Sequence, residues 1–321
     1  MKLVFSKSEL SKAVGIVMKA VPTRTTMNIL ECILIDATTN VIKFTSNDME
    51  LGIETIVEGE IIEKGKVAIE AKLFSEIVRR FPDNEVTIST DSNYTSLITC
   101  EKSKINIAGK SGEDFSFLPI IDKDKMITIS QFNLKEIINQ TIFSTAPNDN
   151  NKMMTGELFE VSDNTLKVVG LDGHRIAIRS IQLEGRADDV KAVVPGKTLQ
   201  EISKLMSTDA ENMVNIYFTN NHILFEFDNT IVVSRLIEGE YFKINQMLSS
   251  DYETKVVINK KEFIGSIDRA NLLITESEKK PIIINITDGS LEVTVNSSKG
   301  KFNEDINIKK EGKDLMIGFN P

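Results

Sequence analysis

The chain has 321 residues, of which 41% are hydrophobic and 26% charged, and its formal net charge is −9. This composition is typical of a soluble globular protein, and the length predicts two or three domains rather than one core. No N-terminal stretch resembles a signal peptide, and no apolar run approaches the roughly 20 residues that span a bilayer. The two cysteines, Cys32 and Cys100, lack the spacing of a zinc site or disulfide framework. We therefore expect a cytoplasmic protein with no metal, no cofactor and no membrane partner.

The first elements in the chain set a pattern. Ser6 to Glu9 form a capping box, and apolar residues at helical spacing follow until Pro22, which ends the predicted helix. A hairpin then turns at residues 38–40, and a further strand covers residues 51–57.

The same pattern returns along the chain. A strand at 66–69 precedes a predicted helix over 71–81, whose apolar face we expect to contain Leu73, Phe74, Ile77, Val78 and Phe81. Further helices are predicted over 133–145, 196–206 and 259–271. Predicted hairpin turns have their centres near residues 39, 92, 163, 220 and 289. Successive gaps of about 53, 71, 57 and 69 residues give, in pairs, a period of about 124 to 128 residues, which is the size of a domain.

This period predicts a chain of three repeated domains, at 1–120, 126–247 and 254–321, each with two strand–helix–hairpin–strand halves. A sixth turn would fall near residue 345 on the same period, beyond Pro321. The expected fold class is α+β, and the third domain is expected to be incomplete.

Basic residues concentrate in the helices. Across the five helical spans, 13 Lys and Arg side chains stand against 6 acids, which leaves −16 for the remainder of the chain. The simpler interpretation is that these are solvated helix faces. The alternative is a positive surface on an acidic body, suited to bind nucleic-acid phosphates in a salt-sensitive way without reading bases.

The polar cluster Asp172-Gly173-His174-Arg175 stands where one strand begins. Asp172 and His174 could act as an acid and base, and a hydrolase using this pair is one alternative. Catalysis would also need a nucleophile, a metal set or an oxyanion device, and the sequence has no GxSxG, Walker A, HExxH or dinucleotide-binding motif. His222 is expected to be a solvated turn residue. We therefore expect no catalytic residue, and a tight turn with local hydrogen bonds is a plausible role for the cluster.

A third interpretation is a protein-docking groove. Apolar side chains lie in segments expected to be exposed loops, and methionine suits a groove that accepts several partners because it repacks easily. These residues are Met153, Met154, Tyr241, Phe242 and Met247.

The three repeats, with Asp172-Gly173-His174-Arg175-Ile176-Ala177 in the second, resemble the bacterial DNA polymerase III beta subunit family, the sliding clamps. Further stretches of the resemblance are Pro22 to Arg24 followed by Ile29-Leu30, Val194 to Lys197, Ser234 to Gly239 and Ile317 to Asn320. The resemblance covers the whole chain and implies domains of two helices packed on two small antiparallel sheets.

The resemblance implies a non-catalytic processivity factor of chromosomal replication: a head-to-tail homodimeric ring around double-stranded DNA. The implied partners are the DNA polymerase III alpha subunit, the clamp loader complex and other proteins with a clamp-binding motif. The DNA contacts it implies are Arg24, Lys72, Arg79, Arg80 and Lys197. The implied partner groove between domains two and three contains Met154, Leu171, Gly173, His174, Arg175, Ile176, Phe242, Gln246, Met247 and Asn320. The implied dimer interface contains Ile105, Ile107, Leu272 and Leu273.

The sequence also departs from the family pattern. Phe242 stands where the family usually has a loop proline, Gln246 replaces a neighbouring base, and Lys152 and Met153 replace tyrosines that often contact DNA. The family's C-terminal tail has no counterpart. A repeat scaffold that binds proteins but not DNA remains a second alternative.

Overall fold

The computed structural model describes residues 1–185, 187–248, 251–275, 278 and 280–320. The chain divides into two compact units, Met1–Tyr241 and Phe242–Pro321, which we describe separately. Pro321, the expected last residue of the third domain, lies outside the described residues. Among those residues, no helix combines the length and apolar content needed to cross a membrane.

The first unit contains two copies of the repeat. The strands of the first copy are β1 (Lys2–Ser6), β2 (Cys32–Asp36), β3 (Ile42–Asn47), β4 (Leu51–Val57), β5 (Glu60–Glu63), β6 (Lys66–Glu70), β7 (Glu85–Thr90), β8 (Thr95–Cys100) and β9 (Ser103–Ser111). Its helices are α1 (Lys7–Val17), the 3-10 turn η1 (Met18–Ala20), α2 (Ala71–Arg80) and η2 (Gly112–Asp114).

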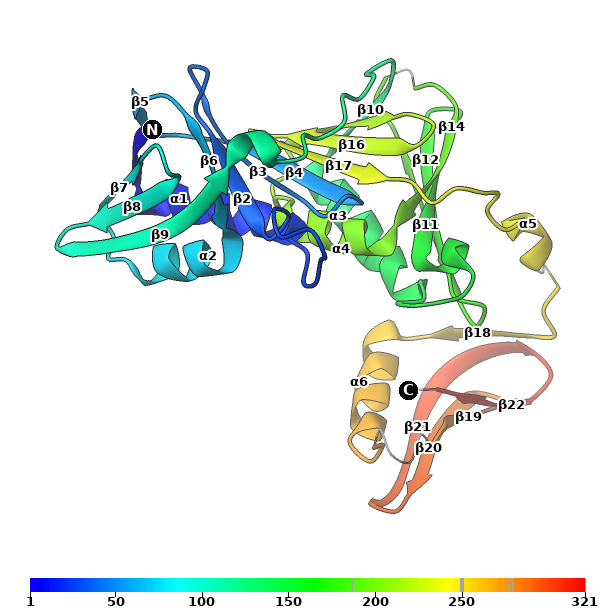
Figure 1. Cartoon of the computed structure of the whole chain (residues 1–321). Helices are drawn as coiled ribbons and strands as arrows, with labels where there is room; N and C mark the ends of the chain where they lie inside the picture. Colours follow the sequence, from blue (N-terminus) through cyan, green and yellow to red (C-terminus); the bar gives the residue numbers. More distant parts are fainter. Residues whose placement is uncertain (186, 249–250, 276–277, 279, 321) are drawn as a thin grey trace. The chain divides into compact units, whose positions relative to one another are not determined.

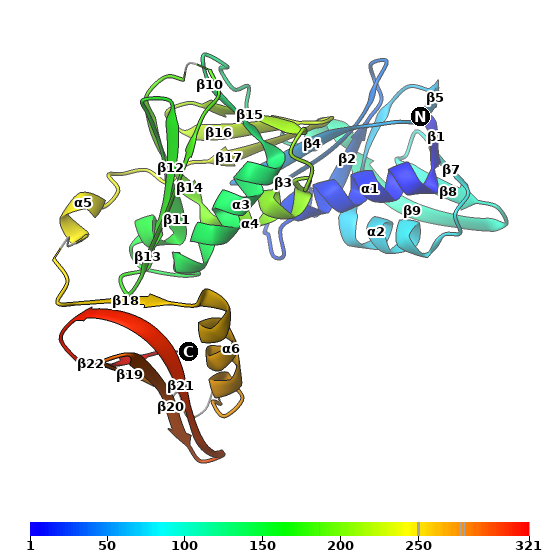
Figure 2. The same cartoon turned by 180° about the vertical axis from the view of Figure 1, so that it is seen from behind.

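The second copy follows the same order. Its strands are β10 (Lys125–Ser130), β11 (Gly156–Ser162), β12 (Thr165–Leu171), β13 (Ile176–Gln182), β14 (Val190–Pro195), β15 (Met213–Phe218), β16 (His222–Phe227) and β17 (Thr230–Arg235). Its helices are α3 (Gln131–Thr141), η3 (Ile142–Ser144), η4 (Lys152–Thr155) and α4 (Gly196–Leu205). Figures 1 and 2 show α1 beside α2 and α3 beside α4.

The second unit has one five-stranded sheet in the order β18-β21-β20-β19-β22. Its elements are α5 (Ile244–Met247), β18 (Thr254–Ile258), α6 (Lys260–Asn271), β19 (Ile282–Thr287), β20 (Ser290–Ser297), β21 (Gly300–Gly312) and β22 (Leu315–Phe319).

The sheets of the first unit are larger than the sequence predicts. A 13-stranded sheet runs β10-β15-β16-β17-β4-β3-β2-β6-β9-β8-β7-β1-β5, beside a four-stranded sheet β13-β12-β11-β14. The long strand β9 joins two sheets of the first copy, because residues 103–108 pair with β8 and residues 109–111 pair with β6. The antiparallel pairing of β4 with β17 joins the two copies into one sheet (Figure 1).

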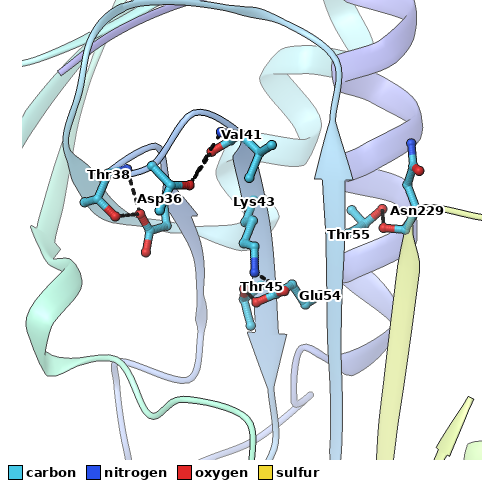
Figure 3. Close-up of polar contacts among 9 residues, drawn as sticks. Asp36, Thr38, Val41, Lys43, Thr45, Glu54, Thr55 and Asn229 are labelled. Atoms are coloured by element: carbon cyan, nitrogen blue, oxygen red, sulfur yellow. Dashed lines mark hydrogen bonds and ion pairs between the residues drawn. The ribbon is translucent and has the colours of Figure 1, made fainter. Parts of the chain in front are cut away.

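Side chains reinforce the seam between β4 and β17. The Thr55 and Thr230 hydroxyls lie 2.9 Å apart across it, and the Ile56 N–H donates to the Asn229 carbonyl at 2.9 Å. Figure 3 shows Thr55 beside Asn229, with the Lys43–Glu54 ion pair at 2.8 Å linking β3 to β4. The two copies are therefore joined by hydrogen bonds between main-chain groups as well as by the connecting loop.

Figure 3 also shows the β2–β3 turn, where the Asp36 carboxylate accepts the Thr38 N–H and hydroxyl.

Local sequence signals explain the helix starts. Ser6 caps α1 and Ser130 caps α3, each accepting the N–H three residues on. Asn259 caps α6 and accepts the N–H groups of Lys261 and Glu262. The five predicted helices are all present, as are the five predicted hairpin turns, each between antiparallel partners. The structure thus has the predicted α+β repeats.

One predicted core residue is wrong. Leu73 was expected on the buried face of α2, but its side chain is 48% exposed while Phe74, Ile77 and Val78 are buried. The reason is its angular position: at 100° per residue, Leu73 lies at the edge of the apolar face, about 90° from the centre of Phe74, Ile77 and Val78. Within the core of the unit, the Phe44 ring contacts the Phe5 ring edge-on, with 5.9 Å between the ring centroids.

Candidate nucleic-acid interface and partner surface

The predicted DNA contacts are all exposed in the first unit. Arg24 follows η1, Lys72 and the pair Arg79 and Arg80 stand on α2, and Lys197 stands in the first turn of α4. The helical regions of the two copies lie close together, because Lys19 Nζ on η1 is 3.6 Å from the Glu201 carboxylate on α4. The structure therefore places four of these cations on α2 and α4 and Arg24 in the loop after η1, all within one unit.

Their ion pairs differ in kind. Arg79 and Arg80 both contact Glu76, one helical turn away, at 2.7 and 3.1 Å. Lys197 instead reaches from the second copy to Asp48 in the first, at 2.7 Å between Nζ and Oδ2. The exposed ion pairs of Glu76 along one helix should break easily. The Lys197–Asp48 pair instead links two different elements and so restrains the position of the lysine.

An open hollow of about 630 Å³ lies beside Lys197. The loop before η4 forms one wall, and Pro195 and Lys197 form another. Lys152 and Asp149 also line the hollow, so two ammonium groups and one carboxylate surround it. Lys152, noted above as a departure from the resemblance, is exposed at this hollow.

The turn at Asp172 is closed by local hydrogen bonds. One oxygen of its carboxylate accepts the backbone N–H of His174 at 3.0 Å and that of Arg175 at 3.2 Å. The other oxygen accepts the Arg175 Nε–H at 2.9 Å. Burial opposes ionisation of Asp172, but these bonds outweigh it and lower its pKa.

This geometry does not support the hydrolase alternative. The Asp172 carboxylate binds the backbone of His174, so it does not orient the imidazole as a general base would require. Among the described residues, no cluster of three or more His, Cys, Asp or Glu could hold a metal ion. The cluster is a rigid turn that presents His174 and Arg175 to solvent, with the Arg175 guanidinium 5.7 Å from the Phe143 ring centroid.

The residues of the second copy that were predicted to line a groove lie around this turn. Gly173 has a φ of 85°, which favours glycine, and the Met154 methyl group lies 3.8 Å from where a Cβ at Gly173 would stand. Met154 and Ile176 are half-buried. Leu171 is fully buried, because it is the last residue of β12 and faces the interior. Its side chain supports the surface from beneath and is not presented on it.

The other predicted groove residues belong to the second unit. Gln246 and Met247 are exposed on the short helix α5, Phe242 precedes this helix and is half-buried, and Asn320 is exposed after β22. The sequence analysis did not predict α5, which has only four residues.

Two of the predicted dimer residues lie in the first unit and two in the second. Ile107 is buried in the core of the first unit, and Ile105 packs against that core. Leu273 packs against the core of the second unit, whereas Leu272 is 75% exposed. Of these four side chains, Leu272 is therefore the one strongly exposed to solvent.

The sequence did not indicate that an acidic residue near the Asp172 turn is buried. Glu157 on β11 is fully buried, and neither of its carboxyl oxygens has a hydrogen-bond partner in the described part of the chain. The nearby Thr141 hydroxyl donates instead to the Ile137 carbonyl. Burial raises the pKa of Glu157 to about 8. The pKa of Tyr241 is raised mainly by burial of its phenol and secondly by the charge of Glu157.

Comparison with known proteins decides the family. Models of the DNA polymerase III beta subunit match as its N-terminal domain at residues 1–119, its central domain at 128–243 and its C-terminal domain at 245–321. The chain belongs to the DNA polymerase III beta subunit family. It is therefore a sliding clamp, a non-catalytic processivity factor of DNA replication.

Individual relatives agree with this assignment. The beta sliding clamp of Staphylococcus epidermidis is 35% identical over 313 residues, which cover 94% of this chain and 83% of the relative. That of Staphylococcus aureus is 34% identical with the same coverage. A DNA polymerase III beta subunit structure from Eubacterium rectale matches with a TM-score of 0.96 at 64% identity, and the Bacillus subtilis sliding clamp with 0.95 at 32%. Each match covers 100% of this chain and 87% of the other.

Proposed function

We propose that this clamp forms a head-to-tail homodimeric ring that encircles double-stranded DNA without reading its sequence. The exposed cations on the helices of an otherwise acidic chain carry this proposal. Lysine and arginine side chains bind phosphates electrostatically, and such contacts hold any sequence equally. A closed ring adds topological linkage, so long residence on DNA does not require tight contacts. The proposed DNA contacts are Arg24, Lys72, Arg79, Arg80 and Lys197.

The strand pairing supports a dimer. Residues 103–108 of β9 pair with β8 on one edge, and residues 300–307 of β21 pair with β20 on one edge. Within the described part of the chain, the opposite edge of each segment has no ladder partner. Such edges can pair with another chain. We propose that these edges, together with Leu272, meet across the two subunits.

We further propose that residues around the Asp172 turn, together with the exposed residues Gln246 and Met247 of α5, bind the DNA polymerase III alpha subunit, the clamp loader and other proteins with a clamp-binding motif. The rigid Asp172 turn would offer a fixed polar edge, and Met154 and Met247 would adapt to different apolar side chains. We place this replication protein in the cytoplasm, where the bacterial chromosome lies.

Retention on circular DNA tests the proposal. The clamp, loaded onto a nicked circular duplex by its clamp loader, is expected to stay bound during gel filtration and to leave once the circle is linearised. Loss on linearisation distinguishes encirclement from ordinary binding, because the surface contacts are the same in both forms. A clamp that is not retained on the circle, yet still binds partner peptides, would favour the protein scaffold and refute the ring.

A further inference from the structure

Two turns in the first unit share one construction. After β3, the Asp48 carboxylate accepts the N–H groups of Glu50 at 3.0 Å and Leu51 at 2.7 Å, as Asp172 does after β12 for the two residues at the same spacing. The residue after each Asp has a positive φ, 74° at Met49 and 85° at Gly173. Each turn also links two adjacent antiparallel strands. The Asp48 turn is therefore the first-copy equivalent of the Asp172 turn.

The turns differ in what the second carboxylate oxygen binds. At Asp172 it accepts the Arg175 side chain, which belongs to the same turn. The corresponding residue in the first copy is Leu51, which has no polar side-chain group. Asp48 Oδ2 instead binds Lys197 Nζ, 149 residues away on α4. A repeated local turn has thus become a link from the first copy to a proposed DNA contact in the second.

Asp48 is a fixed counter-charge. Its side chain is only 8% exposed and its other oxygen is held by two backbone N–H groups, whereas the Lys197 side chain is 69% exposed. Glu76, the partner of Arg79 and Arg80, is 46% exposed and stands on the same helix as they do. Glu76 can move aside when a phosphate approaches, but Asp48 cannot. A phosphate at Lys197 must therefore share the ammonium group with a carboxylate that stays in place.

We propose that Asp48 is a positioning residue that limits how strongly Lys197 binds DNA phosphates, and so keeps the clamp mobile on duplex DNA. This inference rests on the proposed role of Lys197 as a DNA contact. A ring is held by its topology, so strong phosphate contacts add resistance to sliding without being needed for retention. Asp48 also fixes Lys197 beside the hollow that Lys152 lines, which keeps the two ammonium groups at a defined place.

Asp48→Asn tests the inference, because asparagine keeps an oxygen for the Glu50 and Leu51 N–H groups but removes the charge. Freeing Lys197 should tighten binding to a short linear duplex at low salt. It should also steepen the plot of log affinity against log salt by up to about 0.9, the contribution of one phosphate contact. Between about 50 and 200 mM salt, the variant should then lose up to about 3.5-fold more affinity than the parent. Fluorescence anisotropy measures both values, and loaded clamps should diffuse more slowly along stretched DNA.

Two controls separate this effect from a structural one. Asp172→Asn changes the equivalent turn, whose carboxylate binds Arg175, and should leave the salt slope at the parent value. In a Lys197→Gln background, Asp48→Asn should no longer change the slope. Asp48→Asn changes the turn equally with and without Lys197. Even if it weakens the fold, the difference between its two effects therefore isolates the Asp48–Lys197 coupling.

The outcomes are distinct. A parent slope in Asp48→Asn, or an equal effect with Lys197 removed, overturns the role of Asp48 even if the parent clamp is retained on circular DNA. Failure of the parent to be retained overturns the proposed function, and this inference with it.

Discussion

The two units of the chain bury their apolar residues in different ways. In Met1–Tyr241, one continuous core runs through both copies of the repeat beneath a shared sheet. In Phe242–Pro321, the described core contains nine buried residues around one sheet and one helix. Apolar residues of this unit, including Val257, Ile264 and Leu272, remain exposed. The same repeated pattern therefore gives a large continuous core in one unit and a small core in the other.

This difference indicates that the β4–β17 pairing between the two copies contributes to the stability of the first unit. Residues 51–55 of β4 pair with residues 230–234 of β17, so unfolding either copy exposes the backbone edge of the other. We expect the two copies to unfold together. The second unit, with a smaller core of its own, should unfold separately and at lower denaturant concentration.

The largest expected effect comes from the aromatic core of the first unit. Phe44 is fully buried between Phe5 and Phe74, so Phe44→Ala should lower the free energy of unfolding of the first unit by about 3–5 kcal/mol. Urea unfolding followed by hydrogen exchange measures each unit. Ile282→Ala is the matched change in the second unit and should shift only the transition of that unit. If either variant shifts both transitions together, the units are not independent.

A smaller effect should follow pH through Glu157. Its folded-state pKa of about 8 lies above its ordinary value of 4.5, so its stabilising contribution is full below pH 4.5 and is lost as the pH rises through about 8. From about pH 5 to 8, the first unit should lose on the order of 3 kcal/mol. Glu157→Gln should remove this loss and be more stable than the parent at pH 8.

Glu160→Gln on the same strand is the control for this pH effect. The Glu160 carboxylate binds Lys191 at 2.6 Å, a contact that lowers its pKa. Its contribution is therefore present above its ordinary pKa and is lost only in acid, so the pH 5 to 8 loss should persist in this variant. Thermal melts across pH distinguish the two glutamates, and equal slopes in both variants would contradict the role of Glu157.

The smallest expected effects concern the helix caps. Ser130→Ala removes an acceptor for the Asn133 N–H in the first unit, and Asn259→Ala removes one for Lys261 and Glu262 in the second. Each should cost about 1 kcal/mol. Because the second unit has the smaller core, the same cost should raise its unfolded fraction to a more readily detected level. Hydrogen exchange of α3 in Ser130→Ala and of α6 in Asn259→Ala compares the two effects. Equal losses of protection in α6 and in the β19–β20 hairpin would show that the second unit opens as a whole.

Local features of the chain could be predicted from the sequence. The Ser6 cap and the turns rich in Asn, Asp and Gly act over a few residues, so their positions followed from spacing alone, whereas the start of the third helix was predicted at 133 and lies at Gln131. The domain bounds that the repeat period gives, 1–120, 126–247 and 254–321, stay a prediction. The short helix α5 and the turn η4 were missed, because elements of four residues carry too little periodicity to stand out.

Long-range features could not be predicted in this way. The Lys197–Asp48 pair joins residues 149 positions apart, and no local pattern indicates which carboxylate meets which lysine. Glu157 was missed for a related reason. A charged residue in a strand normally points to solvent, but β11 is covered on both faces, so consecutive residues are buried. The exposed cations could be named from the family resemblance, whereas the Asp48 counter-charge of Lys197 required the structure.

The seam between β4 and β17 also has a mechanical consequence. A run of main-chain hydrogen bonds crosses from one copy to the next, so flexing the chain at this point would strip amide and carbonyl groups of their partners. The first two copies should therefore move as one stiff arc. If the proposed ring bends when it opens, this seam should not be the place that bends.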